Sequence, residues 1–131
     1  MLNNYRVEPS DSGYPVDRGF NLSTGKTIQT KFGKVWLVQR NRKEKKWELV
    51  EHEGYYFEGE LMSGEKYVFV IHKRLKNENR WVISDPKSGL LILVGDLQNM
   101  RELLEEGLHH IKTGVDMDMI REGWVWRSKN I

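Results

Sequence analysis

The sequence predicts an α+β fold, an antiparallel β-meander of five to seven strands packed by one main C-terminal amphipathic helix. Residues 33–94 form short segments rich in β-branched and aromatic residues, separated by turn residues, which is typical of strands. In residues 97–112 the apolar residues instead recur every three or four positions, which indicates an amphipathic helix. Because the strands come first and the helix follows, the pattern predicts an α+β fold.

The individual strands follow from the turn residues between them. A weaker first hairpin is expected over residues 20–30, around Ser23–Gly25. The turn at residues 85–89 is well defined, because Pro86 fixes one φ angle and Gly89 permits a positive one. The expected strands are 35–39, 47–51, 55–60, 66–72, 80–84 and 90–94, with turns at 41–46, 52–54, 63–64, 76–79 and 85–89.

Several expected strands are apolar at consecutive positions. In residues 66–72, Tyr67, Phe69 and Ile71 point to one face of the sheet, while Val68 and Val70 point to the other. Strands that are buried on both faces have this pattern. The helix can cover one face. The other face needs the N-terminal residues, the last residues or a second copy of the chain, so a homodimer is one of the alternatives.

Two residues can cap the predicted helix. Asp96 can cap it directly, or Asn99 can cap it with Glu102 three residues later, the spacing of a capping box. A further helical turn is expected over residues 117–122, and a final strand over residues 124–126. The apolar stripe that would pack on the sheet is Met100, Leu103, Leu104, Leu108 and Ile111.

Length and composition indicate one domain. At 131 residues the chain can bury a core without cross-links, and it has no cysteine, which excludes disulfides and thiolate metal sites. Residues 1–19 are rich in turn residues and are expected to be an extended or flexible segment before a single α+β domain, residues 20–131. The first residues lack the pattern of a secretion signal, and the longest apolar stretch, residues 90–94, is too short to span a membrane. We therefore expect a cytoplasmic protein that has no membrane partner.

Charge is arranged in blocks, although the net charge is only +2. Residues 39–47 contain five basic residues and one acidic residue, and residues 71–81 contain four basic residues and one acidic residue. Between these blocks, residues 48–65 contain six glutamates and no basic residue. Such blocks predict distinct surfaces.

The basic turns, together with nearby aromatic residues, indicate a nucleic-acid-binding surface. Basic side chains attract phosphates, and aromatic rings stack on bases. In the predicted meander the two basic turns lie at opposite ends of the sheet, so they join only if the sheet curves or Arg40, Lys73 and Arg74 connect them. The alternative is that the turns are merely solvated and the aromatic residues form the core. The candidate phosphate contacts are Arg40, Arg42, Lys43, Lys45, Lys46, Lys73, Arg74 and Lys76, and the candidate stacking rings are Trp36, Trp47 and Tyr56.

A protein-binding regulator or inhibitor, of the type that phages and mobile elements direct at a host protein, is the alternative function. Its candidate interface combines Glu58 and Glu60 of the acidic block with Trp124 and Trp126 near the C-terminus. Aromatic residues often dominate the binding energy of interfaces. The two tryptophans could instead close the core.

No group of residues predicts catalysis, a metal site or a cofactor. His72, Ser84 and Asp85 supply the residue types of a hydrolase triad, but no nucleophile-elbow glycines surround the serine. His109 and His110 are adjacent, whereas two zinc ligands on a helix would be four residues apart. We therefore expect a non-enzymatic binding module without metal or cofactor, whose partner is nucleic acid or a host protein. An enzyme of unknown class is a distant alternative.

Overall fold

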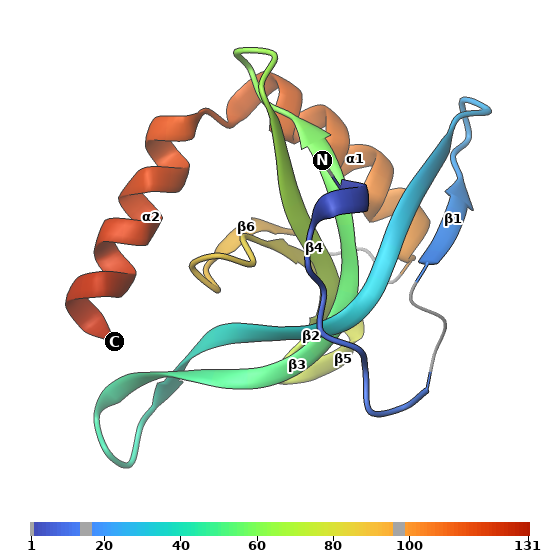
Figure 1. The fold of residues 1–131 in the computed structure, drawn as a ribbon. Coiled ribbons are helices and arrows are strands. Elements are labelled where there is room, and N and C mark those ends of the chain that lie inside the picture. The colour runs from blue at the N-terminus through green and yellow to red at the C-terminus, as the bar shows by residue number, and fades with distance from the viewer. Residues whose placement is uncertain (1, 14–16, 96–98) are drawn as a thin grey trace.

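Six antiparallel strands form a single sheet in sequence order among the described residues, and two helices follow them (Figure 1). The computed structural model describes residues 2–13, 17–95 and 99–131. The predicted α+β meander with a packed C-terminal helix is confirmed. The elements are the 3-10 turn η1 (Leu2–Asn4), β1 (Asp17–Asn21), β2 (Thr27–Asn41), β3 (Lys46–Glu60), β4 (Lys66–Arg74), β5 (Asn77–Ser84), β6 (Leu91–Val94), α1 (Met100–Gly114) and α2 (Met117–Asn130).

Two long strands, β2 and β3, form the centre of the fold. Each has 15 residues, and they pair from Thr30 opposite Phe57 to Asn41 opposite Lys46. The predicted turn at residues 52–54 is therefore wrong, since β3 continues through it. Gly54 is buried, and a Cβ on it would lie 2.8 Å from Val70 Cγ2, so this glycine permits close packing against β4.

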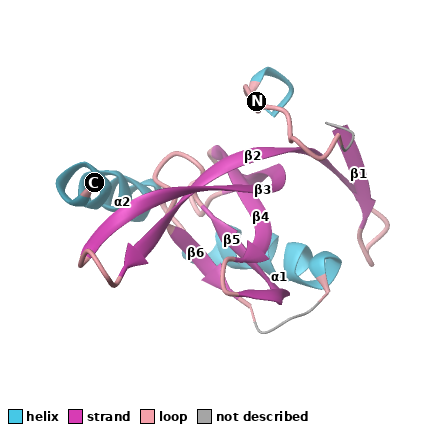
Figure 2. Cartoon of the chain, turned by 90° about the horizontal axis from the view of Figure 1, so that it is seen from below, coloured by secondary structure: helices cyan, strands magenta, loops and turns pink. Residues whose placement is uncertain are grey.

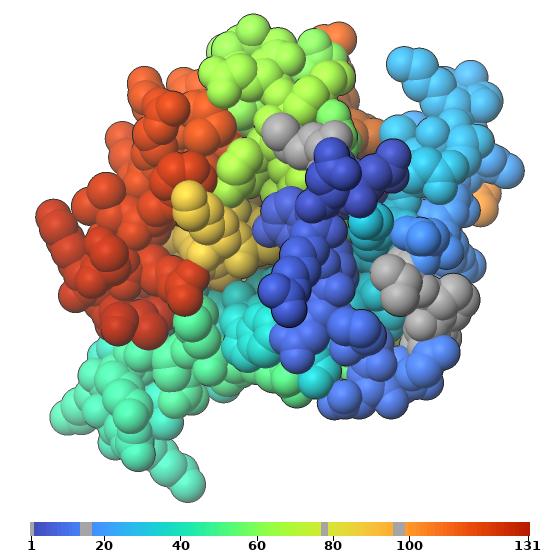
Figure 3. All heavy atoms as spheres, in the orientation of Figure 1, coloured from blue at the N-terminus to red at the C-terminus, as the bar shows by residue number. Residues whose placement is uncertain are grey.

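The missing turn changes which turns share an end of the sheet. Because residues 46–60 are one strand, the β2–β3 turn and the β4–β5 turn lie at the same end, and the prediction of opposite ends is wrong. Strand β4 pairs with β3 only over residues 55–60. The outer parts of β2 and β3 consequently leave the sheet as a hairpin that projects from the body (Figures 1 and 3).

Both faces of the sheet are covered, as the consecutive apolar residues of β4 predict. The α1 face contains Phe69 and Ile71, and the opposite face contains Val68 and Val70. Residues 2–13, here called the N-terminal strap, supply Leu2, which is buried on the second face. Figure 2 shows α1 and the N-terminal turn on opposite sides of the sheet. The α1-side core is Phe57, Leu61, Phe69, Ile71, Ile83, Leu103, Leu104, Ile111, Val115 and Ile120, and the strap-side core is Leu2, Val35, Leu37, Tyr56, Val68 and Val70.

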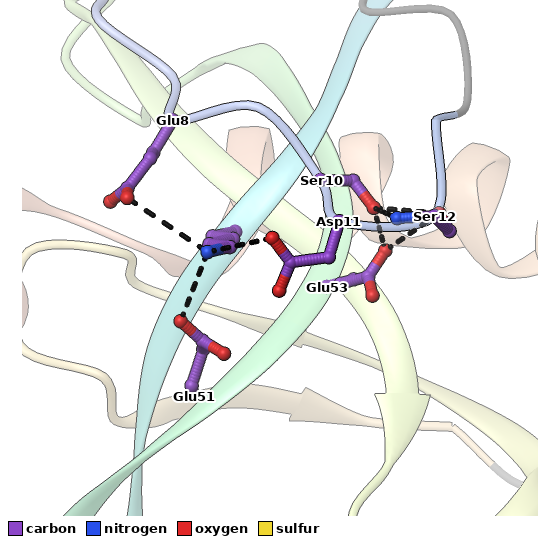
Figure 4. A network of polar contacts seen from close by, with 7 residues as sticks. Glu8, Ser10, Asp11, Ser12, Glu51 and Glu53 are labelled. Atoms are coloured by element: carbon purple, nitrogen blue, oxygen red, sulfur yellow. Dashed lines mark hydrogen bonds and ion pairs between the residues drawn. The ribbon is translucent and has the colours of Figure 1, made fainter.

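Polar contacts fix the N-terminal strap to β2 and β3 (Figure 4). The backbone N–H of Lys34 donates to Glu8 O at 2.8 Å. The Lys34 ammonium lies 3.1 Å from Asp11 and 3.4 Å from Glu51, and its hydrogen bond with Asp11 is the main cause of its raised pKa. The hydroxyls of Ser10 and Ser12 donate to Glu53 Oε2 on β3. The strap thus covers the face that α1 leaves open, while the division into residues 1–19 and 20–131 stays a prediction.

The first helix begins where the Asn99 cap predicts. Asn99 Oδ1 accepts from the backbone N–H groups of Arg101 at 2.9 Å and Glu102 at 3.3 Å. The alternative cap, Asp96, lies outside the described residues. The apolar stripe packs as expected, because Leu103, Leu104 and Ile111 are fully buried.

The predicted strand over residues 124–126 is wrong, because these residues belong to α2. Asp116 caps this helix by accepting from Met119 N at 2.9 Å. Ile120 and Trp124, four residues apart, both pack on the α1-side core, which is helical spacing rather than the two-residue spacing of a strand. Helix α2 continues through Gly123, where a Cβ would lie 3.2 Å from Leu90 Cδ1, so the glycine permits close packing.

A buried carboxylate joins α2 to the sheet. Asp85, 1% exposed, accepts at Oδ1 from the Tyr67 hydroxyl (2.7 Å) and Lys87 N (3.0 Å). Its Oδ2 accepts from the Ser88 hydroxyl (2.8 Å) and Trp124 Nε1 (3.0 Å). Burial and the nearby carboxylate raise the pKa of Tyr67, so its hydroxyl stays a donor. The Asp85 carboxylate therefore connects β4, the β5–β6 turn and α2.

We expect Asp85→Asn to lower the free energy of unfolding by about 3 kcal/mol, because an amide cannot accept four hydrogen bonds and its NH2 group would face donors. Chemical denaturation followed by tryptophan fluorescence measures this loss. Asp118→Asn is the control, since this exposed carboxylate pairs with Arg121 at 3.4 Å on the surface of α2. A loss for Asp85→Asn no larger than that of the control would contradict the anchoring role.

Candidate functional site

A pocket of about 450 Å³ lies at the end of the sheet that carries both basic turns. Its size is in the range that holds a small molecule or a single nucleotide. Strands β2, β4, β5 and β6 and the turns that join them supply its walls. The lining residues are Leu37, Val38, Gln39, Arg40, His72, Arg74, Leu75, Lys76, Arg80, Val82, Ser84, Gly89 and Leu91.

One side of the pocket is closed by contact between the β5–β6 turn and β2. Val38 N donates to Gly89 O at 3.0 Å. Gly89 has a φ of +76°, and a Cβ on it would lie 2.7 Å from Trp36 O, so this position needs glycine both for conformation and for space. The N–H of Val38 points away from β3. Because backbone N–H groups alternate along a strand, the N–H of Arg40 also points to the edge of β2 that faces away from β3.

The rim of the pocket is cationic. Arg40 comes from the end of β2, Arg74 from the end of β4 and Lys76 from the β4–β5 turn, and all three are exposed. Arg80 of β5 also lines the pocket and is half-buried. None of the described lining residues is acidic. Charges of one sign around a concave, low-dielectric wall concentrate the field, so this rim attracts anions.

The walls below the rim are apolar. Leu37 and Val82 are buried, and Leu75 is half-buried. Leu91 lines the pocket although 49% of its surface is exposed to solvent. A cationic rim above an apolar wall suits a ligand that has both an anionic group and a flat or apolar body.

The polar floor is a hydrogen-bonded pair, His72 and Ser84, which are 3% and 2% exposed. His72 Nδ1 lies 2.8 Å from Lys73 O, and His72 Nε2 lies 2.7 Å from Ser84 Oγ. A carbonyl oxygen only accepts, so Nδ1 carries the hydrogen and Nε2 accepts the serine proton. Burial lowers the pKa of His72 to about 4, which keeps the ring neutral at pH 7.

This assignment fixes what Ser84 can offer to a ligand. Because its proton points to His72, its oxygen keeps lone pairs and acts as an acceptor. The pair has the contact of a nucleophile and its base, but His72 Nδ1 bonds to a carbonyl rather than to a carboxylate. A protonated His72 would be buried without an opposite charge, so the geometry favours hydrogen bonding over proton transfer.

The predicted phosphate-binding residues lie in three places. Arg40, Arg74 and Lys76 meet at the pocket rim, although two of them are more than 30 residues from the first in sequence. Lys73 does not line the pocket, and its ammonium lies 5.7 Å from the Trp81 ring centroid. The others occupy the tip of the projecting β2–β3 hairpin: Arg42, Lys43 and Lys45, which are exposed, and Lys46, which pairs with Glu44 at 2.6 Å.

The predicted stacking residues also divide. Trp36 and Trp47 are 40% and 38% exposed, and the Arg40 guanidinium carbon lies 5.2 Å from the Trp47 ring centroid. Tyr56 is only 5% exposed and its hydroxyl donates to Lys34 O at 2.5 Å, so it packs the strap-side core. Two of the three rings are therefore accessible to a ligand.

The residues of the alternative protein interface contact different parts of the fold. Glu58 Oε2 accepts from Leu2 N at 3.4 Å, and Glu60 lies 3.8 Å from Lys66 and 3.9 Å from Lys112. Trp124 bonds to Asp85, while the Trp126 ring centroid lies 5.2 Å from that of Trp47 in an edge-to-face contact. These contacts do not gather the four residues into one surface.

Arg80, His72 and Ser84 were not predicted as ligand-binding residues. Arg80 belongs to the second basic block, so the charge pattern contained a signal for it. His72 and Ser84 are twelve residues apart in sequence and lie on neighbouring strands. Only the pairing of β4 with β5 could have indicated that they touch.

Compared with known protein families, curated proteins and solved structures, the chain matches none of them. No described helix combines the length and apolar character that crossing a membrane requires. Within the described part of the chain, no three histidine or carboxylate side chains converge as metal ligands.

We expect Gly89→Ala to lower the free energy of unfolding by about 3 kcal/mol, because it adds backbone strain and a clash with β2. Gly25→Ala is the matched control, since Gly25 also has a positive φ (+87°) but a Cβ added there would have nothing within 4 Å. The control should lose only about 1 kcal/mol. Thermal and chemical denaturation measure both, and equal losses would argue against the β2 contact.

The buried neutral His72 makes stability depend on pH. Its pKa is about 4 in the folded chain and 6.5 in the unfolded chain, so the unfolded state takes up a proton first as the pH falls. Stability is thus lost between about pH 6.5 and 4, by roughly 3 kcal/mol. His72→Gln, whose side-chain oxygen can accept from Ser84, should flatten this part of the curve by that amount. Denaturation of the wild type and of His72→Gln at several pH values measures this difference. Parallel stability curves would refute the role of His72 in the pH dependence.

Proposed function

We propose that this protein is a non-enzymatic nucleic-acid-binding module that holds phosphates at the basic end of its sheet. The observation that carries the proposal is the meeting of Arg40, Arg74 and Lys76 around one pocket. Basic side chains gathered on a concave surface neutralise phosphates and release counterions. Because the net charge is only +2, attraction would come from this local surface rather than from the whole molecule.

The accessible rings support the same function. Trp47 is partly exposed and lies under the Arg40 guanidinium, so a phosphate bound to Arg40 would lie close to an aromatic ring. Aromatic faces beside cations are typical of surfaces that bind single strands with little sequence preference. A cytoplasmic location agrees with this function and stays a prediction.

Two triple variants separate the pocket rim from the hairpin tip. We expect Arg40→Glu/Arg74→Glu/Lys76→Glu to weaken oligonucleotide binding by at least about 100-fold, because it removes the phosphate contacts. Arg42→Glu/Lys43→Glu/Lys45→Glu changes the net charge equally but lies on the projecting tip, so we expect a loss below about tenfold. Fluorescence of the five tryptophans during titration measures both affinities.

Salt dependence is the second measurement. Neutralising about three phosphates of a single strand predicts that log K falls with log salt at a slope of about −2. The rim variant should flatten this slope, and the tip variant should keep most of it. No binding by the wild-type protein at low salt would overturn the proposed function and favour the protein-partner alternative.

A further inference from the structure

We infer that the pocket seats one unstacked nucleobase of a single strand, with its inner edge on Ser84 and the adjoining phosphates on Arg40, Arg74 and Lys76. This inference rests on the proposed function and adds what the pocket itself recognises. Phosphate binding needs only the rim. Behind the rim the pocket also has an apolar wall and a polar floor, which phosphate binding does not need.

The size of the pocket selects a single strand. A volume of about 450 Å³ accepts one base with its sugar, whereas a duplex keeps its bases stacked and paired inside the helix. Extracting a base from a duplex costs a few kcal/mol, and a single strand avoids most of that cost. The pocket therefore favours single-stranded over duplex nucleic acid.

The wall and the floor match different parts of a base. Leu37, Val82 and Leu91 supply apolar contact for its faces. At the floor, the bond from Ser84 to the neutral His72 Nε2 leaves the serine oxygen as an acceptor. Each of the common bases has an N–H donor on its pairing edge, so any of them can meet this acceptor. We therefore expect a preference for bases over bare phosphates, with little preference among bases.

Leu91, at the mouth of the pocket, is a site where a substitution can test base binding directly. Leu91 and Val94 both lie on β6 and are 49% and 48% exposed, but only Leu91 lines the pocket. Leu91→Trp fills the pocket from its mouth without changing any charge or any buried residue. Val94→Trp adds the same side chain to the same strand outside the pocket, so it controls for effects on folding, which thermal denaturation of both variants checks.

The probes are a short oligothymidylate, an abasic oligomer with the same number of phosphates, a duplex of the same length, and thymidine 5′-monophosphate. For the wild type and Val94→Trp, we expect the oligothymidylate to bind at least about tenfold more tightly than the abasic oligomer and the duplex. Leu91→Trp should bind the oligothymidylate about tenfold more weakly, while its salt slope and its affinity for the abasic oligomer stay unchanged.

The outcomes separate this inference from the proposed function. If no oligonucleotide binds the wild type, the proposed function fails and this inference fails with it. If the oligothymidylate binds but Leu91→Trp equals Val94→Trp, or the abasic oligomer binds equally well, phosphate binding stands and the base pocket is refuted. If thymidine 5′-monophosphate binds as tightly as the oligothymidylate, the single strand is refuted as the ligand, and the pocket is assigned to a free nucleotide.

Discussion

The remaining structure depends on the hydrogen bonds that the buried Asp85 carboxylate accepts from four donors. It gives the β5–β6 turn its shape by accepting from Lys87 N and Ser88, and it holds α2 through the indole of Trp124. The same turn presents Gly89 to β2 and so closes one wall of the pocket. The position of α2 and the shape of the candidate site thus both depend on one buried carboxylate that accepts four hydrogen bonds.

The candidate site arises from curvature rather than from a sequence motif. Strand β3 passes from its pairing with β4 into the projecting hairpin, and this divergence opens the space that the pocket occupies. Residues from four strands then contribute different chemistry: cations at the rim, aliphatic side chains in the wall and a neutral histidine–serine pair at the floor. The β4–β5 hairpin supplies members of all three groups, and β2, the β5–β6 turn and β6 complete the pocket.

Local signals in the sequence were sufficient for much of the fold and little of the site. The Asn99 cap and the two-faced pattern of β4 depend on neighbouring residues, so they could be predicted correctly. Gly54 could not be interpreted in this way, because glycine suits both a turn and a close approach, and contact with Val70 on another strand decides between them. That one error reversed the placement of the basic turns. Trp124 and Trp126 have strand-like spacing, yet both belong to α2, where Ile120 and Trp124 pack on the α1-side core at helical spacing.

The N-terminal strap has a consequence for how the molecule is assembled. Its docking surface, which includes Gly33, Tyr56 and Val68, is formed by β2, β3 and β4 together. During translation the strap leaves the ribosome before any of these strands, and its docking surface is complete only when all three have paired. Residues made early are therefore placed late, and the apolar face beneath them stays open to chaperones or to neighbouring chains until the meander is complete.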